Sequence, residues 1–159
     1  MMCKWIIQLE IFLNMLFNGR SEQRILAWRE FRNNLNSWPA DINRVADAWR
    51  YAPTIGNYLT FDRTDNWPDA WQLINDNMFC DVGVALGIFY TLYYSSYPHK
   101  DSLQLQGIRL QKNHKDINLV ICEGGLYVLN YDIGRVVNIL TIPQDGTVNY
   151  KLTPANLIR

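Results

Sequence analysis

The feature that most constrains this fold is an uncharged run of sixteen residues, 82–97, placed just before the chain changes its hydrophobic pattern. A helix that is apolar on all sides has to be buried, in a membrane or at the centre of a core. Sixteen residues fall short of the roughly 20 that a membrane-spanning helix needs. The β-rich sequence that follows can supply the layer that covers such a helix. The run therefore predicts a central core helix, starting near Asp76 or Asn77, with Cys80 in its first turn.

The apolar residues beyond His99 recur at every second position, which is typical of strands. Strands are predicted at residues 103–112, 117–123, 126–131 and 135–142, and a last hairpin turns at residues 144–146. The pair Gly124 and Gly125 predicts a two-residue turn, in which Asn118 would face Tyr131. The predicted fold class is α+β, with an N-terminal helical region followed by the central helix packed on an antiparallel sheet.

The first fifty residues read as helices. Residues 5–17 form an apolar stretch that is too short to span a bilayer and is interrupted by polar residues, unlike a secretory signal. It is predicted to be a packing helix that ends at Gly19. Ser21 is expected to cap a second helix reaching residue 36, and a third follows from Asp41.

Composition narrows the function classes. The 159 residues carry 15 Lys and Arg against 15 Asp and Glu, a balance that argues against a non-specific nucleic-acid binder. Hydrophobic residues make up 48% and aromatic residues 13%, enough for a core and for a surface that is partly an interface. The three cysteines form no CxxC pair, and no phosphate-binding or metal-binding motif occurs, so neither a metal nor another cofactor is expected. Two units are predicted: a helical region, 1–53, and an α+β core, 54–159.

Cys80 is the residue with a chemical interpretation. The start of a helix favours a thiolate, which can act as a nucleophile, although free cysteines are also common core residues. A base for it is harder to find. His99 follows the far end of the predicted helix, roughly 25 Å away at 1.5 Å per residue. His114 precedes the strand at 117–123, about 10 Å along the ladder from Asp132, and needs a bent loop to act with it.

The order of these elements resembles the transglutaminase-like branch of the papain-like cysteine hydrolases, over roughly residues 66–142. The resemblance is strongest in residues 118–130, Asn-Leu-Val-Ile-Cys-Glu-Gly-Gly-Leu-Tyr-Val-Leu-Asn. This segment resembles the family pattern of a histidine, then an apolar strand, a glycine-rich turn and a second strand that ends in aspartate. The resemblance implies that Cys80 matches the nucleophile and Asn130, or less well Asp132, the orienting residue. Asn118 stands at the histidine position, where an asparagine cannot act as a base near neutral pH.

The segment at 67–80 and the apolar helix after it also resemble small proteins of tailed bacteriophages. Together the resemblances imply a catalytically degenerate protein with a structural or interaction role, such as a head–tail connector or tail component. Its expected partners are virion subunits or further copies of itself, with no specific nucleic acid and no membrane span. Its expected location is the host cytoplasm during assembly or the virion, without secretion. The alternatives are an active peptidase, amidase or transglutaminase that uses Cys80 with His114, and a membrane-associated protein anchored by residues 5–17.

Overall fold

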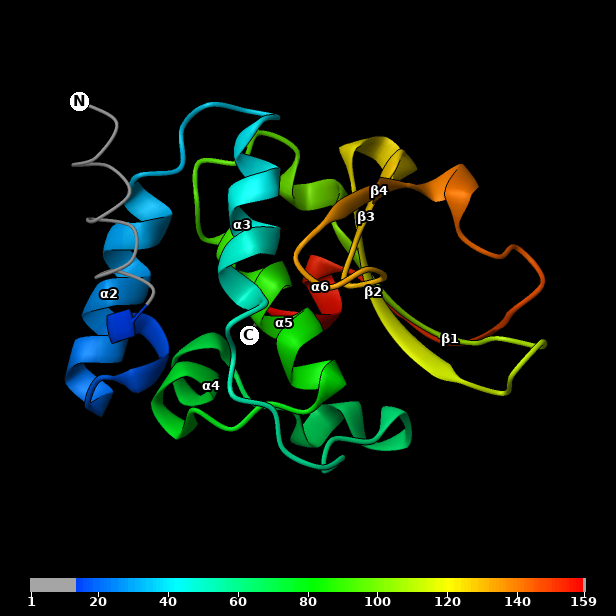
Figure 1. Ribbon diagram of the computed structural model, residues 1–159, viewed down its shortest axis with the longest axis horizontal. Helices are drawn as coiled ribbons and strands as arrows, with labels where there is room; N and C mark the ends of the chain where they lie inside the picture. Colours follow the sequence, from blue (N-terminus) through cyan, green and yellow to red (C-terminus); the bar gives the residue numbers. More distant parts are fainter. Residues whose placement is uncertain (1–13, 159) are drawn as a thin grey trace.

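The computed structural model describes residues 14–158, which form a helical layer packed against one antiparallel sheet (Figure 1). Residues 14–18 are helical. The longer elements are α2 (Ser21–Asn33), α3 (Asp41–Trp49), α4 (Ala70–Asp76), α5 (Asp81–Tyr93), α6 (Pro154–Leu157), β1 (Gln104–Arg109), β2 (Asp116–Cys122), β3 (Tyr127–Leu129), β4 (Val136–Asn138) and β5 (Thr147–Leu152). Short 3-10 turns are η1 (Phe61–Asn66), η2 (Lys100–Ser102), η3 (Glu123–Gly125) and η4 (Ile139–Thr141). The α+β class predicted from the sequence is confirmed.

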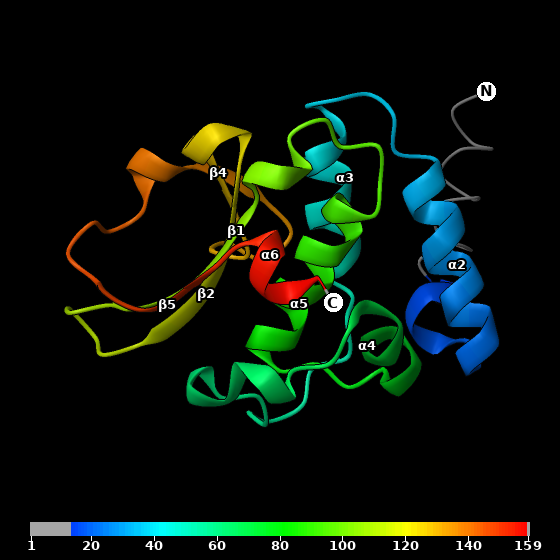
Figure 2. The same ribbon diagram turned by 180° about the vertical axis from the view of Figure 1, so that it is seen from behind.

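The central helix is α5, which lies between the sheet and the N-terminal helices in both views (Figures 1 and 2). All of its residues from Val82 to Leu92 are buried, which explains why this stretch carries no charge. Gly87 lets the Trp49 ring of α3 approach closely, because a Cβ atom there would lie 2.1 Å from that ring. No helix in residues 14–158 is long and apolar enough to cross a membrane. The expectation of a core helix is therefore correct.

The start of this helix differs from the prediction. Residues 70–76 form the separate helix α4, and Asn77 ends it in the left-handed region with φ of 51°. Asparagine tolerates that conformation, so its side chain here marks the end of a helix rather than the beginning of one. Cys80 lies at the N-cap of α5 with extended backbone, one residue outside the first turn.

The N-terminal helices are held to α5 through one hydroxyl group. Thr91 Oγ1 accepts hydrogen bonds from the indole N–H groups of Trp28 on α2 and Trp49 on α3, at 3.0 and 2.9 Å. The same hydroxyl donates to the Gly87 carbonyl oxygen at 2.6 Å. All three polar groups are thus satisfied inside an otherwise apolar core.

Two predicted helix boundaries near the N-terminus were wrong. Arg20 rather than Ser21 occupies the N-cap of α2, and Ser21 begins the helix. The helix ends at Asn33 instead of residue 36, three residues short, and a turn leads into α3. Most of the predicted helix at 5–17, and with it the membrane-anchor alternative, lies outside the described residues, although Leu16 and Phe17 are buried in the core.

The sheet has the order β4-β3-β2-β1-β5, with every neighbouring pair antiparallel. β1, β3 and β4 are shorter than the predicted strands; β1, for example, spans Gln104–Arg109 instead of 103–112. β2 has the predicted length but begins one residue earlier, at Asp116. The predicted last hairpin at 144–146 was wrong, because β5 pairs with β1 at the opposite edge of the sheet from β4. One face of the sheet packs on α5. The other face carries a second apolar cluster made of Leu110, Ile117, Leu119, Ile121, Val128 and Ile142.

The turn between β2 and β3 is wider than predicted, but its register is as predicted. Val120 pairs with Leu129 and Cys122 with Tyr127, so four residues form the connection instead of two. The physical reason lies at Glu123, whose N–H donates to the Tyr97 hydroxyl while its carboxylate accepts from the same hydroxyl. These two bonds tie Glu123 to the chain beyond α5, and it takes a left-handed φ of 52°.

Candidate functional site

The site begins at Cys80, whose side chain is buried with 1% of its surface exposed. The extended backbone before it pairs with the segment after α3, because Ile55 N–H donates to the Phe79 carbonyl oxygen at 2.8 Å. Two tyrosines lie close enough to the thiol for its charge to matter. The pKa of Tyr58 is raised by burial and then by the charge of Cys80; that of Tyr150 is raised by burial, then by Asp81 and Cys80.

Asn118 on β2 faces the start of α5 and is 8% exposed. Its Nδ2 donates to Asp81 Oδ2 at 2.6 Å, and its Oδ1 accepts from the Tyr150 hydroxyl at 2.5 Å. The amide nitrogen therefore has an acceptor, Asp81, and the amide oxygen has a donor, Tyr150. An amide held in this way has a fixed orientation and no ionisable proton to transfer.

Gly107 explains how Tyr150 reaches across the sheet. Gly107 on β1 pairs with Asn118 on one side and with Tyr150 of β5 on the other. The Tyr150 ring lies over it, and a Cβ atom at position 107 would be 2.1 Å from Tyr150 Cε1. Trp67 packs edge-on against the same ring, with ring centroids 5.3 Å apart. Glycine in a strand interior often marks such a close approach.

Asn130 joins the same network from the end of β3. Its backbone turns into the left-handed region with φ of 67°, and the ladder ends just before it, at Leu129. Its Nδ2 donates to the Asn118 carbonyl oxygen at 2.9 Å and to Asp81 Oδ1 at 3.2 Å. Asp81, Asn118, Asn130 and Tyr150 thus form one hydrogen-bonded cluster at the start of α5, which we call the Asp81 cluster.

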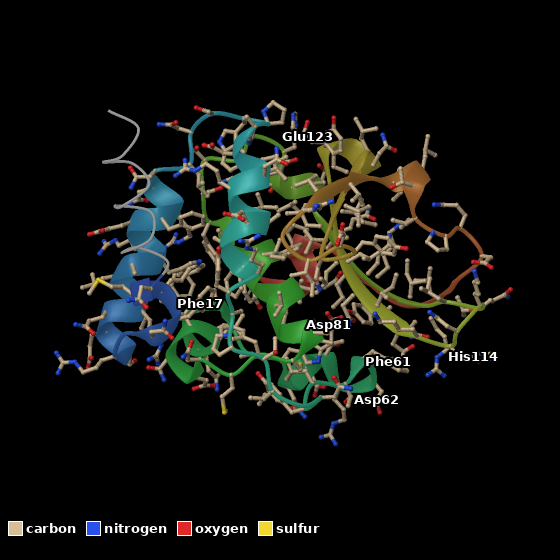
Figure 3. The ribbon with its side chains drawn as sticks, in the orientation of Figure 1. Phe17, Phe61, Asp62, Asp81, His114 and Glu123 are labelled. Carbon is tan, nitrogen blue, oxygen red and sulfur yellow. The ribbon has the colours of Figure 1, made fainter. Side chains whose placement is uncertain are left out.

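The other sequence candidates lie away from Cys80. His114 stands in the connection between β1 and β2, at the free end of the hairpin and away from Asp81 (Figure 3). Asn118 is four residues further along β2, roughly 13 Å at the rise of a strand. Asp132 is exposed, and its carboxylate lies 3.9 Å from the guanidinium of Arg135. His99, already excluded by distance, packs against Tyr97 beyond the far end of α5.

Sequence reasoning missed Asp81, Tyr150 and Gly107. Asp81 follows Cys80 directly, but an acidic residue at the start of a helix is common because it stabilises the helix N-terminus, so it gives no signal of a site. Tyr150 reaches the site only because β5 pairs with β1, and no local pattern indicates that pairing. Gly107 was the one available signal, since a glycine inside an alternating strand calls for a packing reason.

A cavity of about 360 Å³ adjoins the Asp81 cluster. Asp81 and Asn130 form part of its wall, and the rest comes from α3, residues 52–57, α5 and residues 133–134. Cys80 is not among the lining residues. Within residues 14–158, no group of three or more His, Cys, Asp or Glu side chains is placed to hold a metal ion.

A buried cysteine lies at the N-cap of the central helix and an antiparallel sheet packs on that helix, an arrangement found in transglutaminase-like folds. Solved structures with this fold are similar to the chain: Legionella pneumophila LapG in calcium-bound and EGTA-treated forms, with TM-scores of 0.67 and 0.68. Each is 15% identical; each alignment covers 91% of this chain and 83% or 81%, respectively, of the LapG chain. No protein-family model and no curated protein matches the sequence.

Proposed function

We propose that this chain is a catalytically degenerate transglutaminase-like protein that acts by binding other proteins. The observation that carries the proposal is Asn118, the β2 residue that faces the start of α5. Its amide is hydrogen-bonded at both ends, to Asp81 and to Tyr150, so it accepts no proton from a thiol. A cysteine hydrolase needs a general base within hydrogen-bond reach of its nucleophile.

The position of the two histidines supports the same conclusion. The chain contains only His99 and His114, and both belong to the described residues. One lies beyond the C-terminal end of α5, and the other at the free end of the β1–β2 hairpin. An active enzyme that uses Cys80 with His114 would require the β1–β2 hairpin to leave the position that it has in this structure.

The partners in this proposal are other proteins, as virion subunits or as copies of the same chain. Its surface offers exposed large apolar side chains, among them Ile133 at 75% and Leu140 at 81% exposure. The proposal of a bacteriophage role is supported by the resemblance of the segment at 67–80 to small phage proteins. We propose accordingly that the protein occurs in the host cytoplasm during assembly or in the particle. It predicts the polypeptide at stoichiometric copy number in purified, washed particles.

Cysteine alkylation tests whether the site is catalytic. The folded protein is treated with iodoacetamide between pH 6 and 9, and labelling of Cys80 and Cys122 is read by mass spectrometry. Both thiols are buried, so we expect both to stay unlabelled until the protein is denatured. Cys122 is the internal reference, since burial and the nearby Glu123 charge raise its pKa to about 12.

Two variants sharpen the result. His114→Ala is expected to leave the labelling of Cys80 unchanged, whereas an enzyme that uses this histidine would lose reactivity. Rapid labelling of Cys80 near pH 7 with Cys122 protected, together with peptide hydrolysis or transamidation that Cys80→Ala abolishes, would overturn the proposal.

A further inference from the structure

The cavity beside the Asp81 cluster has an apolar floor. Trp49 from α3 and Val84 and Ile88 from α5 line it, and all three side chains are buried. Its volume of about 360 Å³ is enough for one long side chain, at the small end of the range for ligand pockets. Apolar walls of this kind bind methylene groups by removing them from water.

The polar groups of the cavity leave one charge without a counter-ion. Asp81 accepts one amide hydrogen bond at each carboxylate oxygen and forms no ion pair with any residue in 14–158. Arg50, the cation that also lines the cavity, is engaged elsewhere: its Nη2 donates to the Tyr51 hydroxyl at 2.7 Å, and its Nε lies 3.4 Å from Asp47. Asp81 is exposed and lies in the first turn of α5, where the helix dipole favours a carboxylate, so the charge at the wall without an ion-pair partner is negative.

The remaining acceptors at the wall belong to more than one residue. Each Asp81 oxygen accepts one hydrogen bond and keeps capacity for another. The Asn130 side-chain oxygen accepts no hydrogen bond from the described residues, and Thr54 is also a lining residue of the cavity. An ammonium group has three donors that can point to separate acceptors, whereas a guanidinium presents a planar fork.

We propose that this cavity receives a lysine side chain of a partner protein. Its methylene stem lies on Trp49, Val84 and Ile88, and its ammonium group pairs with Asp81 and Asn130. This inference rests on the proposed function, because it names the chemistry by which the non-catalytic fold recognises its partner. Charge complementarity with Asp81 selects the ammonium, and the apolar floor selects a long aliphatic stem.

The test is an NMR titration of the isotopically labelled full chain with blocked tripeptides. Acetyl-Gly-Lys-Gly-amide is the probe, and the same peptide with norleucine keeps the stem but lacks the ammonium. We expect the lysine peptide to shift the side-chain amide signals of Asn130 and Asn57 and to bind about two- to five-fold more tightly, the size expected for an exposed ion pair. High salt should remove that difference.

Asp81→Asn is the decisive variant and should bring the lysine peptide down to the affinity of the norleucine peptide. Asp145→Asn removes the same charge from the exposed loop before β5 and should change nothing. Ile133→Lys, at an exposed position on the cavity wall, supplies a competing ammonium and should abolish binding even if Asp81→Asn folds poorly.

Equal binding of the lysine and norleucine peptides, unchanged selectivity in Asp81→Asn, or shifts confined to another surface would each overturn the inference. The arginine peptide is a further comparison, and tighter binding of arginine would contradict the choice of an ammonium. A negative result for lysine binding is distinguishable from a negative result for the proposed non-catalytic function. The titration reports the charge of Asp81, whereas the alkylation experiment reports the reactivity of Cys80.

Discussion

Replacing Gly107 with alanine tests how the Asp81 cluster is held together. The added Cβ would lie 2.1 Å from Cε1, 2.5 Å from Cδ1 and 2.8 Å from Cζ of Tyr150. The ring has to move by roughly 1.3 Å to reach ordinary contact at about 3.4 Å. Such a movement stretches the 2.5 Å hydrogen bond from the Tyr150 hydroxyl to Asn118 beyond bonding distance.

The expected cost follows from three contributions to the free energy of unfolding. Overpacking of a filled site costs about 1–3 kcal/mol. Loss of the hydrogen bond, which leaves the buried Asn118 oxygen without a donor, costs about 1 kcal/mol more. The smaller entropy of the unfolded chain with alanine returns about 0.4–1 kcal/mol. We therefore expect Gly107→Ala to destabilise the protein by about 1–3.5 kcal/mol.

Urea unfolding measures this change, and two comparisons isolate its cause. Gly56→Ala is the matched control, because no atom lies within 4 Å of its added Cβ, and its effect should stay within about 0.5 kcal/mol. Gly107→Ala is then repeated in a Tyr150→Ala background. With the ring absent, the same substitution should cost less than about 0.5 kcal/mol. An equal cost in both backgrounds, or a negligible cost with Tyr150 present, would refute the reasoning.

Three other perturbations have defined outcomes. Thr91→Val leaves two buried indole N–H groups without an acceptor and should cost about 2–5 kcal/mol in urea unfolding, whereas Thr91→Ser should cost only about 1 kcal/mol. Asn118→Asp places a second carboxylate beside Asp81, so the free energy of unfolding should fall by about 2 kcal/mol at pH 7. Most of this loss should be recovered near pH 4, where one of the two carboxylates is protonated. A loss that does not depend on pH would contradict this. Burial and then the Glu123 charge raise the pKa of Cys122 from 9 to about 12, so its contribution to stability is complete below pH 9 and is lost as the pH rises toward 12. About 1 kcal/mol should disappear between pH 9 and 10, and Cys122→Ala should remove that part of the decline.

The core of the fold could be predicted because burial leaves a direct trace in the sequence. The uncharged run at 82–97 gave the position of α5, and the alternating residues beyond His99 gave the strands. The register across the β2–β3 turn was also predictable, because it depends on the centre of the connection and not on its width. The break between α4 and α5 was not, since Asn77 has the side chain of a helix start but the backbone of a helix end.

The site was less accessible to sequence reasoning for a different reason. Asn118 and Asn130 come from strands joined by a short turn, so their proximity follows from local pairing. Tyr150 lies on β5, and Asp81 on α5, and only the three-dimensional arrangement brings them to the same amide. The interaction that fixes the orientation of Asn118 is therefore invisible to any pattern of local spacing.

The order of strands in the sheet has a consequence for how the chain folds. β1 and β2 are joined by a short hairpin, while β5 reaches β1 only after β3, β4 and the segment behind them. Because closing a longer loop costs more entropy, we expect the β1–β2 hairpin to form early and β5 to add last. Docking of the Tyr150 ring over Gly107 is then expected to follow the rate-limiting step. Substitutions at this contact should therefore accelerate unfolding and leave the folding rate almost unchanged.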